Sequence, residues 1–213
     1  MNAPVLPEVR KGRKFDQVLE GAWKVFMQEG YEGASVDDIA RSAGVSKATL
    51  YSYFPDKRLL FLEVAKGECR RQADAAFEMI DFDGPVAEVL TQAAGKMVKF
   101  FLSDFGQQMY RTCVSECYRF PELGCEFFQS GPGLVQDRLA AYFADATARG
   151  ALRVEDPMLA AAQLHELCKA DLHVRLMCGI QSEFSDDEIN RVVSGAVEMF
   201  MGRYGADSSE TGT

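Results

Sequence analysis

The sequence predicts an all-α protein in which a small three-helix domain precedes a larger helical domain. Apolar residues recur at three- and four-residue spacing along most of the 213 residues. Ser, Asp, Gly and Pro punctuate these segments as they do at helix ends. No stretch alternates apolar and polar residues for long enough to predict a strand. We expect about nine or ten helices, divided into residues 1–56, residues 57–204 and a disordered polar tail, 205–213.

A first helix over residues 11–29, ended by Gly30, leads into a segment with the spacing of a helix-turn-helix. Ser35 is placed to cap a helix over 36–43, and Gly44 is the residue type that best adopts the left-handed conformation at its end. Ser46 then caps a second helix over 47–54. Two short amphipathic helices joined by a glycine turn are common, so the spacing by itself also fits a purely structural pair.

The outward face of the second helix favours nucleic acid over that structural alternative. Its residues are Lys47, Ala48, Thr49, Tyr51 and Tyr53. A solvated helix face is usually rich in Glu and Lys, whereas hydroxyl, phenol and ammonium groups suit phosphates and base edges. This face therefore predicts a helix that enters the major groove of DNA.

Seven further helices are expected after Pro55, over residues 57–80, 86–104, 107–119, 122–129, 134–149, 157–178 and 186–204. Gly106 and the tripeptide 131–133, Gly-Pro-Gly, are expected to break helices. Asp56 is a plausible cap for the helix over 57–80, which is long enough to act as a lever between the two domains. Lys57 lies in its first turn, where the ammonium and free backbone N–H groups could share one phosphate.

The net charge of −9 is unevenly distributed. Residues 1–60 contain nine Lys/Arg and eight Asp/Glu, a net of +1, so the acidity belongs to the rest of the chain. A basic cluster of Arg10, Lys11, Arg13 and Lys14 precedes the first helix and is either a DNA-contacting arm or a solvated terminus. There is no run of about 18 apolar residues and no signal-peptide core, so we expect a cytoplasmic protein without a membrane span.

The last two helices carry more apolar residues than one small domain needs, which predicts a homodimer built as a four-helix bundle. An intramolecular bundle is the alternative. The predicted interface residues are Leu164, Leu167, Cys168, Leu172, Val192, Val193, Ala196 and Phe200.

The middle helices are rich in large, adaptable side chains, which fits a pocket for a small apolar or aromatic effector as well as an ordinary core. The candidate lining residues are Met97, Phe101, Phe105, Met109, Cys113, Cys117, Phe127 and Phe128, with Gln163 and His165 as polar anchors. The six cysteines lack the paired spacing of a zinc site, so no metal or other cofactor is expected. No nucleotide-binding loop or catalytic motif is present, and we expect no enzyme.

The segments SVDDIARSAGV and SKATLYSYFPDKRLL resemble the DNA-binding domain of the TetR/AcrR family over about residues 12–62. A weaker likeness to the ligand domain of one AcrR-like branch covers RFPELGCEFFQSGPG and the residues up to the segment LAAAQL. The resemblance implies a homodimeric repressor that binds a palindromic operator and is released when a small molecule enters the middle helices.

By position, the resemblance implies that Lys47, Ala48 and Tyr51 face bases. It assigns phosphate contacts to Ser35, Ser46, Thr49, Tyr53 and Lys57. Ser52 departs from the family pattern, in which many relatives have an aromatic or larger polar group, and this leaves the operator sequence open. Two alternatives are an activator or nucleoid-type DNA binder without an effector, and an all-α enzyme with a fused three-helix module.

Overall fold

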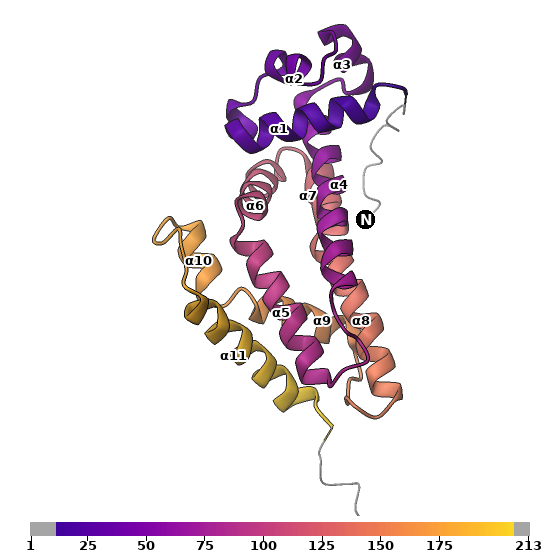
Figure 1. Cartoon of the computed structure of the whole chain (residues 1–213), viewed down its shortest axis with the longest axis vertical. Helices are drawn as coiled ribbons and strands as arrows, with labels where there is room; N and C mark the ends of the chain where they lie inside the picture. The colour runs from indigo at the N-terminus through magenta and orange to yellow at the C-terminus, as the bar shows by residue number, and fades with distance from the viewer. Residues whose placement is uncertain (1–11, 207–213) are drawn as a thin grey trace, which may run out of the picture. The chain divides into compact units, whose positions relative to one another are not determined.

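A computed structural model describes residues 12–206 and confirms the all-α class. In this described part the only β pairing is an isolated bridge between Leu152 and Gly205. The helices are α1 (Phe15–Gly33), α2 (Val36–Ser42), α3 (Lys47–Tyr53), α4 (Lys57–Glu78), α5 (Val86–Leu102), α6 (Asp104–Glu116), α7 (Pro121–Ser130), α8 (Pro132–Ala148), α9 (Pro157–Leu167), α10 (Leu172–Met177) and α11 (Asp186–Tyr204) (Figure 1). Among the described residues, no helix is long and apolar enough to cross a membrane.

Contacts divide the chain into two compact units. The first contains residues 1–72 and 108–131, and the second contains residues 73–107 and 132–213. The helix-turn-helix thus shares its unit with the second half of α6 and with α7. The division into functional domains 1–56 and 57–204 stays a prediction, and most of the predicted disordered tail, residues 207–213, lies outside the described range.

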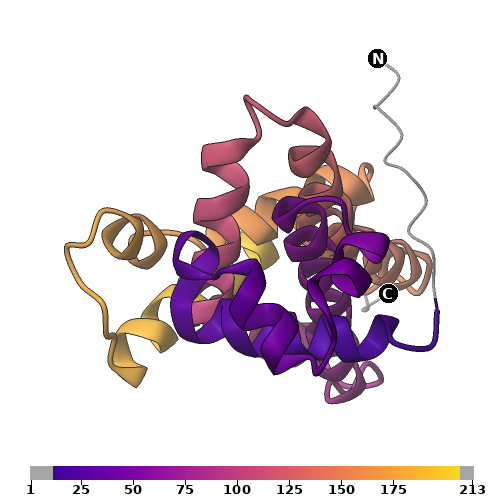
Figure 2. The same cartoon turned by 90° about the horizontal axis from the view of Figure 1, so that it is seen from above.

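In the first unit, α2 and α3 both pack on α1 (Figures 1 and 2). The helix α1 approaches the end of α2 closely at Gly21, where a Cβ atom would lie 2.5 Å from the backbone nitrogen of Ala43. Gly30 has a φ of 69° and interrupts α1 at the predicted place. The short helical segment that follows turns the chain toward Ser35.

The helix break predicted at Gly106 lies elsewhere in the structure. The break before α6 is at Ser103, whose hydroxyl donates to the carbonyl of Phe100 (2.7 Å) and accepts from the N–H of Gly106 (3.1 Å). Gly106 lies inside α6, where a Cβ atom would be 2.2 Å from the Phe100 oxygen, so glycine serves close packing there. The break predicted at 131–133 is confirmed, because the non-helical Gly131 separates α7 from α8. The helix α8 then starts at Pro132, since proline is tolerated in a first turn whose N–H groups are unpaired.

The single helix predicted over 157–178 is two helices, α9 and α10. Asp171 separates them with a φ of 63° and a ψ of −63°, in a tight turn in which the N–H of Leu172 donates to the carbonyl of Ala170 (2.7 Å). Its carboxylate accepts hydrogen bonds from Arg191 (2.5 Å) and Arg175 (3.3 Å). These two guanidinium groups stabilise a turn for which the local sequence has no Gly or Pro signal.

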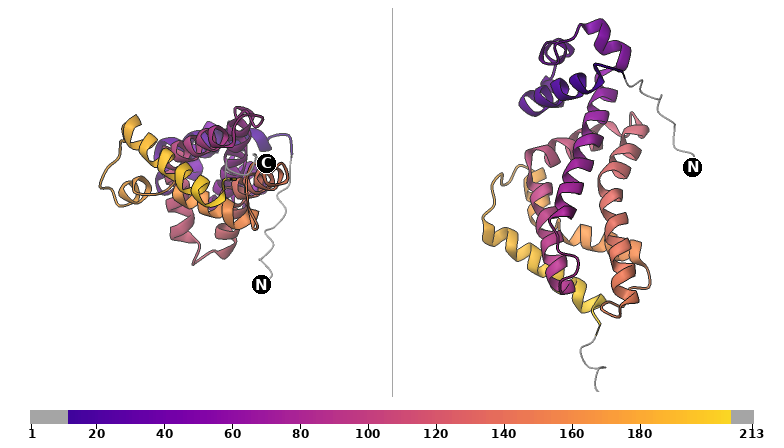
Figure 3. Two further views of the ribbon diagram at one scale, coloured as in Figure 1. Left: turned by 90° about the horizontal axis from the view of Figure 1, so that it is seen from below. Right: turned by 45° about the vertical axis from the view of Figure 1, so that its right-hand side comes forward.

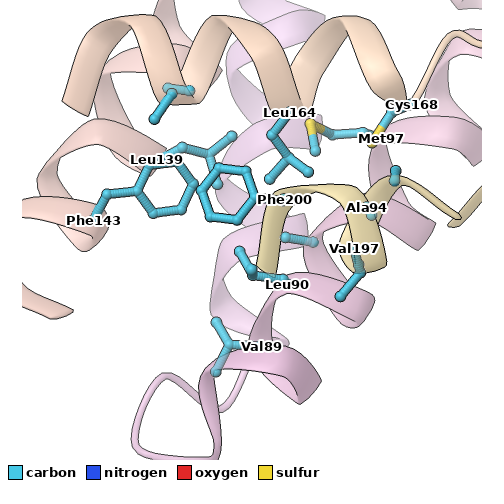
Figure 4. Packing of buried hydrophobic residues seen from close by; sticks show 14 of the residues in the cluster. Val89, Leu90, Ala94, Met97, Leu139, Phe143, Leu164, Cys168, Val197 and Phe200 are labelled. Carbon is cyan, nitrogen blue, oxygen red and sulfur yellow. The ribbon is translucent and has the colours of Figure 1, made fainter. Parts of the chain in front are cut away.

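The second unit is built around α5, α8, α9 and α11, with α11 lying along α5 (Figures 1 and 3). Leu90, Phe143, Leu164 and Phe200 point toward one another in its core (Figure 4). The rings of Phe143 and Phe200 have centroids 4.8 Å apart. A capping box at Ser185 begins α11 as predicted.

Candidate DNA-binding surface and effector residues

The two helices of the helix-turn-helix are capped as predicted. The hydroxyl of Ser35 accepts the N–H of Asp38, and the hydroxyl of Ser46 accepts the N–H of Thr49, each at 3.1 Å. Gly44 has a φ of 62° between the helices. The two serines predicted as phosphate ligands therefore cap the N-terminal ends of α2 and α3.

The two faces of α3 are clearly separated. Leu50 is buried on the inner face, whereas Lys47, Ala48 and Tyr51 are exposed on the outer face, with Tyr51 at 48%. Tyr53 is half-buried, and its ring lies 6.0 Å from that of Phe15. The side chains predicted to meet bases thus face away from α1, while Tyr53 also helps to seat α3 on α1.

Lys47 is not a free cation in the protein without DNA. Its ammonium forms an ion pair with Asp37 at the start of α2. Both side chains are more than half exposed, so this pair contributes at most about 1 kcal/mol and can be exchanged for a phosphate.

The ammonium of Lys57 binds backbone carbonyl groups of its own chain. Its ammonium donates to the carbonyls of Tyr31 (2.7 Å) and Ala34 (3.0 Å), with a longer contact to Glu32 (3.4 Å), and lies 4.6 Å from the Tyr31 ring centroid. Asp56 meanwhile accepts the N–H of Leu59 at the start of α4 (3.0 Å). The predicted phosphate contact of Lys57 stays a prediction, and in this structure the group ties α4 to the end of α1.

A second link within the first unit was not predicted. The guanidinium carbon of Arg58 lies 3.4 Å from the ring centroid of Phe120, in the turn between α6 and α7. Lys66 of α4 forms an ion pair with Glu126 of α7 at 2.7 Å. No local pattern in the sequence indicates that Phe120 stacks on a residue 62 positions away.

Of the candidate effector residues in the first unit, Met109 and Cys113 are buried, with their sulfur atoms 3.5 Å apart. Burial, with the nearby Cys69 and Cys117, raises the pKa of Cys113 to about 12, so its thiol stays protonated at neutral pH. Cys117 and Phe127 are half-buried, whereas Phe128 is 54% exposed. Phe128 therefore does not join the buried group.

In the second unit, Phe101 is the centre of a polar and aromatic cluster. The centroid of its ring lies 5.1 Å from that of His165 and 6.2 Å from that of His173, and the ammonium of Lys169 lies 5.5 Å from the Phe101 centroid. Burial, followed by the nearby Lys169 charge, lowers the pKa of His165 to about 4, so this imidazole is neutral at pH 7. His173 was not predicted.

The remaining candidates in the second unit have different surroundings. Met97 and Phe105 are buried. Gln163 is exposed, and its amide oxygen accepts a hydrogen bond from the Tyr204 hydroxyl at 2.6 Å. Gln163 thus anchors the end of α11 rather than pointing inward.

The predicted interface residues lie inside the protomer. Leu167 is half-buried, and the other seven are buried in the core of the second unit. The same helices expose different apolar residues, among them Met158, Leu159, Val174 and Met199. Gly195 on α11 borders open space, and a Cβ added there would meet no atom within 4 Å. Any second chain that packs on these helices meets this exposed set.

Within residues 12–206, no group of three or more His, Cys, Asp or Glu side chains is arranged to hold a metal ion.

Similarity to known proteins covers both parts of the chain. Residues 18–64 match the family model of the bacterial regulatory proteins of the tetR family, and residues 88–206 match the C-terminal domain of AefR-like transcriptional repressors. The HTH-type transcriptional repressor AcnR of Corynebacterium diphtheriae is 33% identical over 75 residues, which are 35% of this chain and 40% of that repressor.

Two solved structures match over nearly the whole length. A TetR-family transcriptional regulator from Mesorhizobium loti has a TM-score of 0.79 and 28% identity, covering 93% of this chain and 100% of that chain. The Flavonoid-responsive Regulator FrrA has a TM-score of 0.75 and 31% identity with the same coverage. With one family model on the helix-turn-helix and another over more than half of its length, the chain belongs to the TetR family of bacterial transcriptional regulators.

Proposed function

We propose that this regulator is a repressor that binds a palindromic DNA operator as a homodimer in the cytoplasm. The observation that carries the proposal is the outer face of α3, where Lys47, Ala48 and Tyr51 are exposed on a helix whose inner face is buried. A dimer presents two such helices to successive major grooves about 34–36 Å apart.

Selection of bound DNA from a random pool tests the operator. A palindrome whose half-sites are about one helical turn apart is the expected result. Lys47→Ala and Tyr51→Ala should each abolish operator binding in a gel shift and leave the dimer intact. Lys99→Ala and Tyr118→Ala are matched controls, because both side chains are exposed outside the helix-turn-helix. Unchanged affinity in both α3 variants would contradict the proposal.

For the dimer we propose the exposed apolar surface of α9, α10 and α11. Met199 is 65% exposed, and Gly195 lies one helical turn before it with open space above its Cα. An apolar side chain beside a glycine allows two helices to approach closely and to bury a surface that water disfavours.

The proposed effector is a small aromatic molecule that contacts the Phe101–His165 cluster and lowers the affinity for DNA. The Nδ1 atom of the neutral His165 donates to the carboxylate of Glu166 at 3.2 Å, so its Nε2 atom can accept a hydrogen bond from the effector. Phe101 offers a ring for stacking. The solved relative named as flavonoid-responsive directs the first trials to flavonoids. Titration of a flavonoid panel should raise the melting temperature and release labelled operator. If every compound leaves both readouts unchanged, the alternative of an activator or nucleoid-type binder without an effector is favoured.

A further inference from the structure

The cations of the helix-turn-helix region fall into two groups. Residues 12–60 contain seven Lys and Arg side chains, and five of them have partners within the chain. These are Lys24 with Glu20, Arg41 with Asp38, Lys47 with Asp37, Arg58 with Asp56, and Lys57 with backbone carbonyls. Arg13 and Lys14 are exposed and form no ion pair or side-chain hydrogen bond with any described residue.

Arg13 and Lys14 are held beside the end of α3. Gly12 is so close to Tyr53 that a Cβ on it would lie 2.6 Å from the phenol oxygen. The Phe15 ring stacks on that of Phe54 at 5.6 Å, and the N–H of Phe15 donates to the Gly12 carbonyl at 2.9 Å. The chain between Gly12 and Phe15 therefore contacts the C-terminal end of α3 at both of its ends.

We propose that Arg13 and Lys14 form a second contact to the DNA backbone, which flanks the recognition helix and lies outside the helix-turn-helix motif. This proposal rests on the proposed DNA binding. A cation that is exposed and has no ion-pair partner among residues 12–206 gives up no such pair when it meets a phosphate, whereas Lys47 must leave Asp37. The exposed carboxylate of Asp16 in the first turn of α1 offsets one of the two positive charges of Arg13 and Lys14. Arg10 and Lys11 add two further positive charges just before Gly12 in the sequence.

The salt dependence of binding measures this contact. If each of the two side chains neutralises one phosphate in each half-site, the Arg13→Ala/Lys14→Ala dimer loses four contacts. Each contact contributes about 0.9 to the slope of log affinity against log salt, so the slope should fall by about 3.6. Between about 50 and 200 mM salt, the wild type should therefore lose roughly 150-fold more affinity than the double variant. Contacts to the DNA backbone do not depend on the base sequence, so the same decrease in slope is expected on operator DNA and on mismatched DNA.

Two controls isolate position from charge. Arg70→Ala/Lys99→Ala removes the same charges from exposed sites on α4 and α5 and should keep the wild-type slope. Arg13→Lys/Lys14→Arg preserves both cations and should keep it too. An unchanged slope in the Ala double variant, with binding still lost in Lys47→Ala, would overturn this contact alone. A wild-type protein without salt-dependent DNA binding would overturn the proposed function as well.

Discussion

Replacing Lys57 by Met tests whether this residue positions the helix-turn-helix from within the protein. Methionine keeps an unbranched side chain of similar length and removes the ammonium. Gly30 interrupts α1, so the carbonyls after it have no partner from a continuing helix. The ammonium of Lys57 is that partner, because it donates hydrogen bonds to the carbonyls of Tyr31 and Ala34.

The size of the effect follows from these contacts. Each charge-assisted hydrogen bond, at 2.7 and 3.0 Å, contributes about 1–1.5 kcal/mol for a half-buried group. The free energy of unfolding should therefore fall by about 2–3 kcal/mol in Lys57→Met. For a chain of this length, that lowers the melting temperature by roughly 5–10 °C.

Thermal and urea unfolding of the free protein measure this loss without DNA. Lys47→Met is the control, because the exposed pair with Asp37 contributes at most about 1 kcal/mol. Lys47→Met should melt within about 3 °C of the wild type while it loses affinity for DNA. A Lys57→Met protein as stable as the wild type would refute the positioning role and leave only the phosphate contact.

Three further changes have calculable outcomes. The pKa of His165 is about 4 in the folded protein and about 6.5 in the unfolded chain. The free energy of unfolding should therefore fall by up to about 3 kcal/mol as the pH decreases from about 6.5 to about 4, because the unfolded chain binds the proton first. His165→Gln should remove most of this pH dependence in urea titrations. Gly30 has a φ of 69° and a ψ of 175°, a conformation that is essentially restricted to glycine, so Gly30→Ala should cost about 1–3 kcal/mol. Gly95→Ala in the interior of α5 should be neutral or stabilising by up to about 1 kcal/mol in the same titrations. Met199→Glu should shift the dimer toward monomer in analytical ultracentrifugation, because it places a charge in the proposed interface. Met79→Glu is the control and should leave the dimer intact, since Met79 is similarly exposed but lies outside the surface of α9, α10 and α11.

Features set by neighbouring residues were predictable from the sequence. The caps at Ser35, Ser46 and Ser185 and the left-handed Gly44 lie where the sequence places them, because each depends on bonds within three or four residues. The all-α class follows from the same local signals, which repeat along the chain.

Features set by distant residues were not predictable. Asp171 has a positive φ, and the Arg191 guanidinium that binds its carboxylate comes from twenty residues later in the chain. Gly106 was interpreted as a breaker, although its role depends on the carbonyl of Phe100 beneath it. Apolar spacing alone predicts the interface residues, and it cannot distinguish a side chain that faces its own core from one that faces a second chain.

The charge pairs of the first sixty residues suggest how an acidic regulator can bind DNA without binding it indiscriminately. Lys47 must leave Asp37 before it binds a phosphate or a base, which reduces its attraction to non-specific DNA by up to about 1 kcal/mol. Arg13 and Lys14 have no such partner among the described residues and attract any backbone. Specific and non-specific binding would then depend on different cations, and the salt slopes of the two sets of variants on operator and mismatched DNA measure each contribution separately.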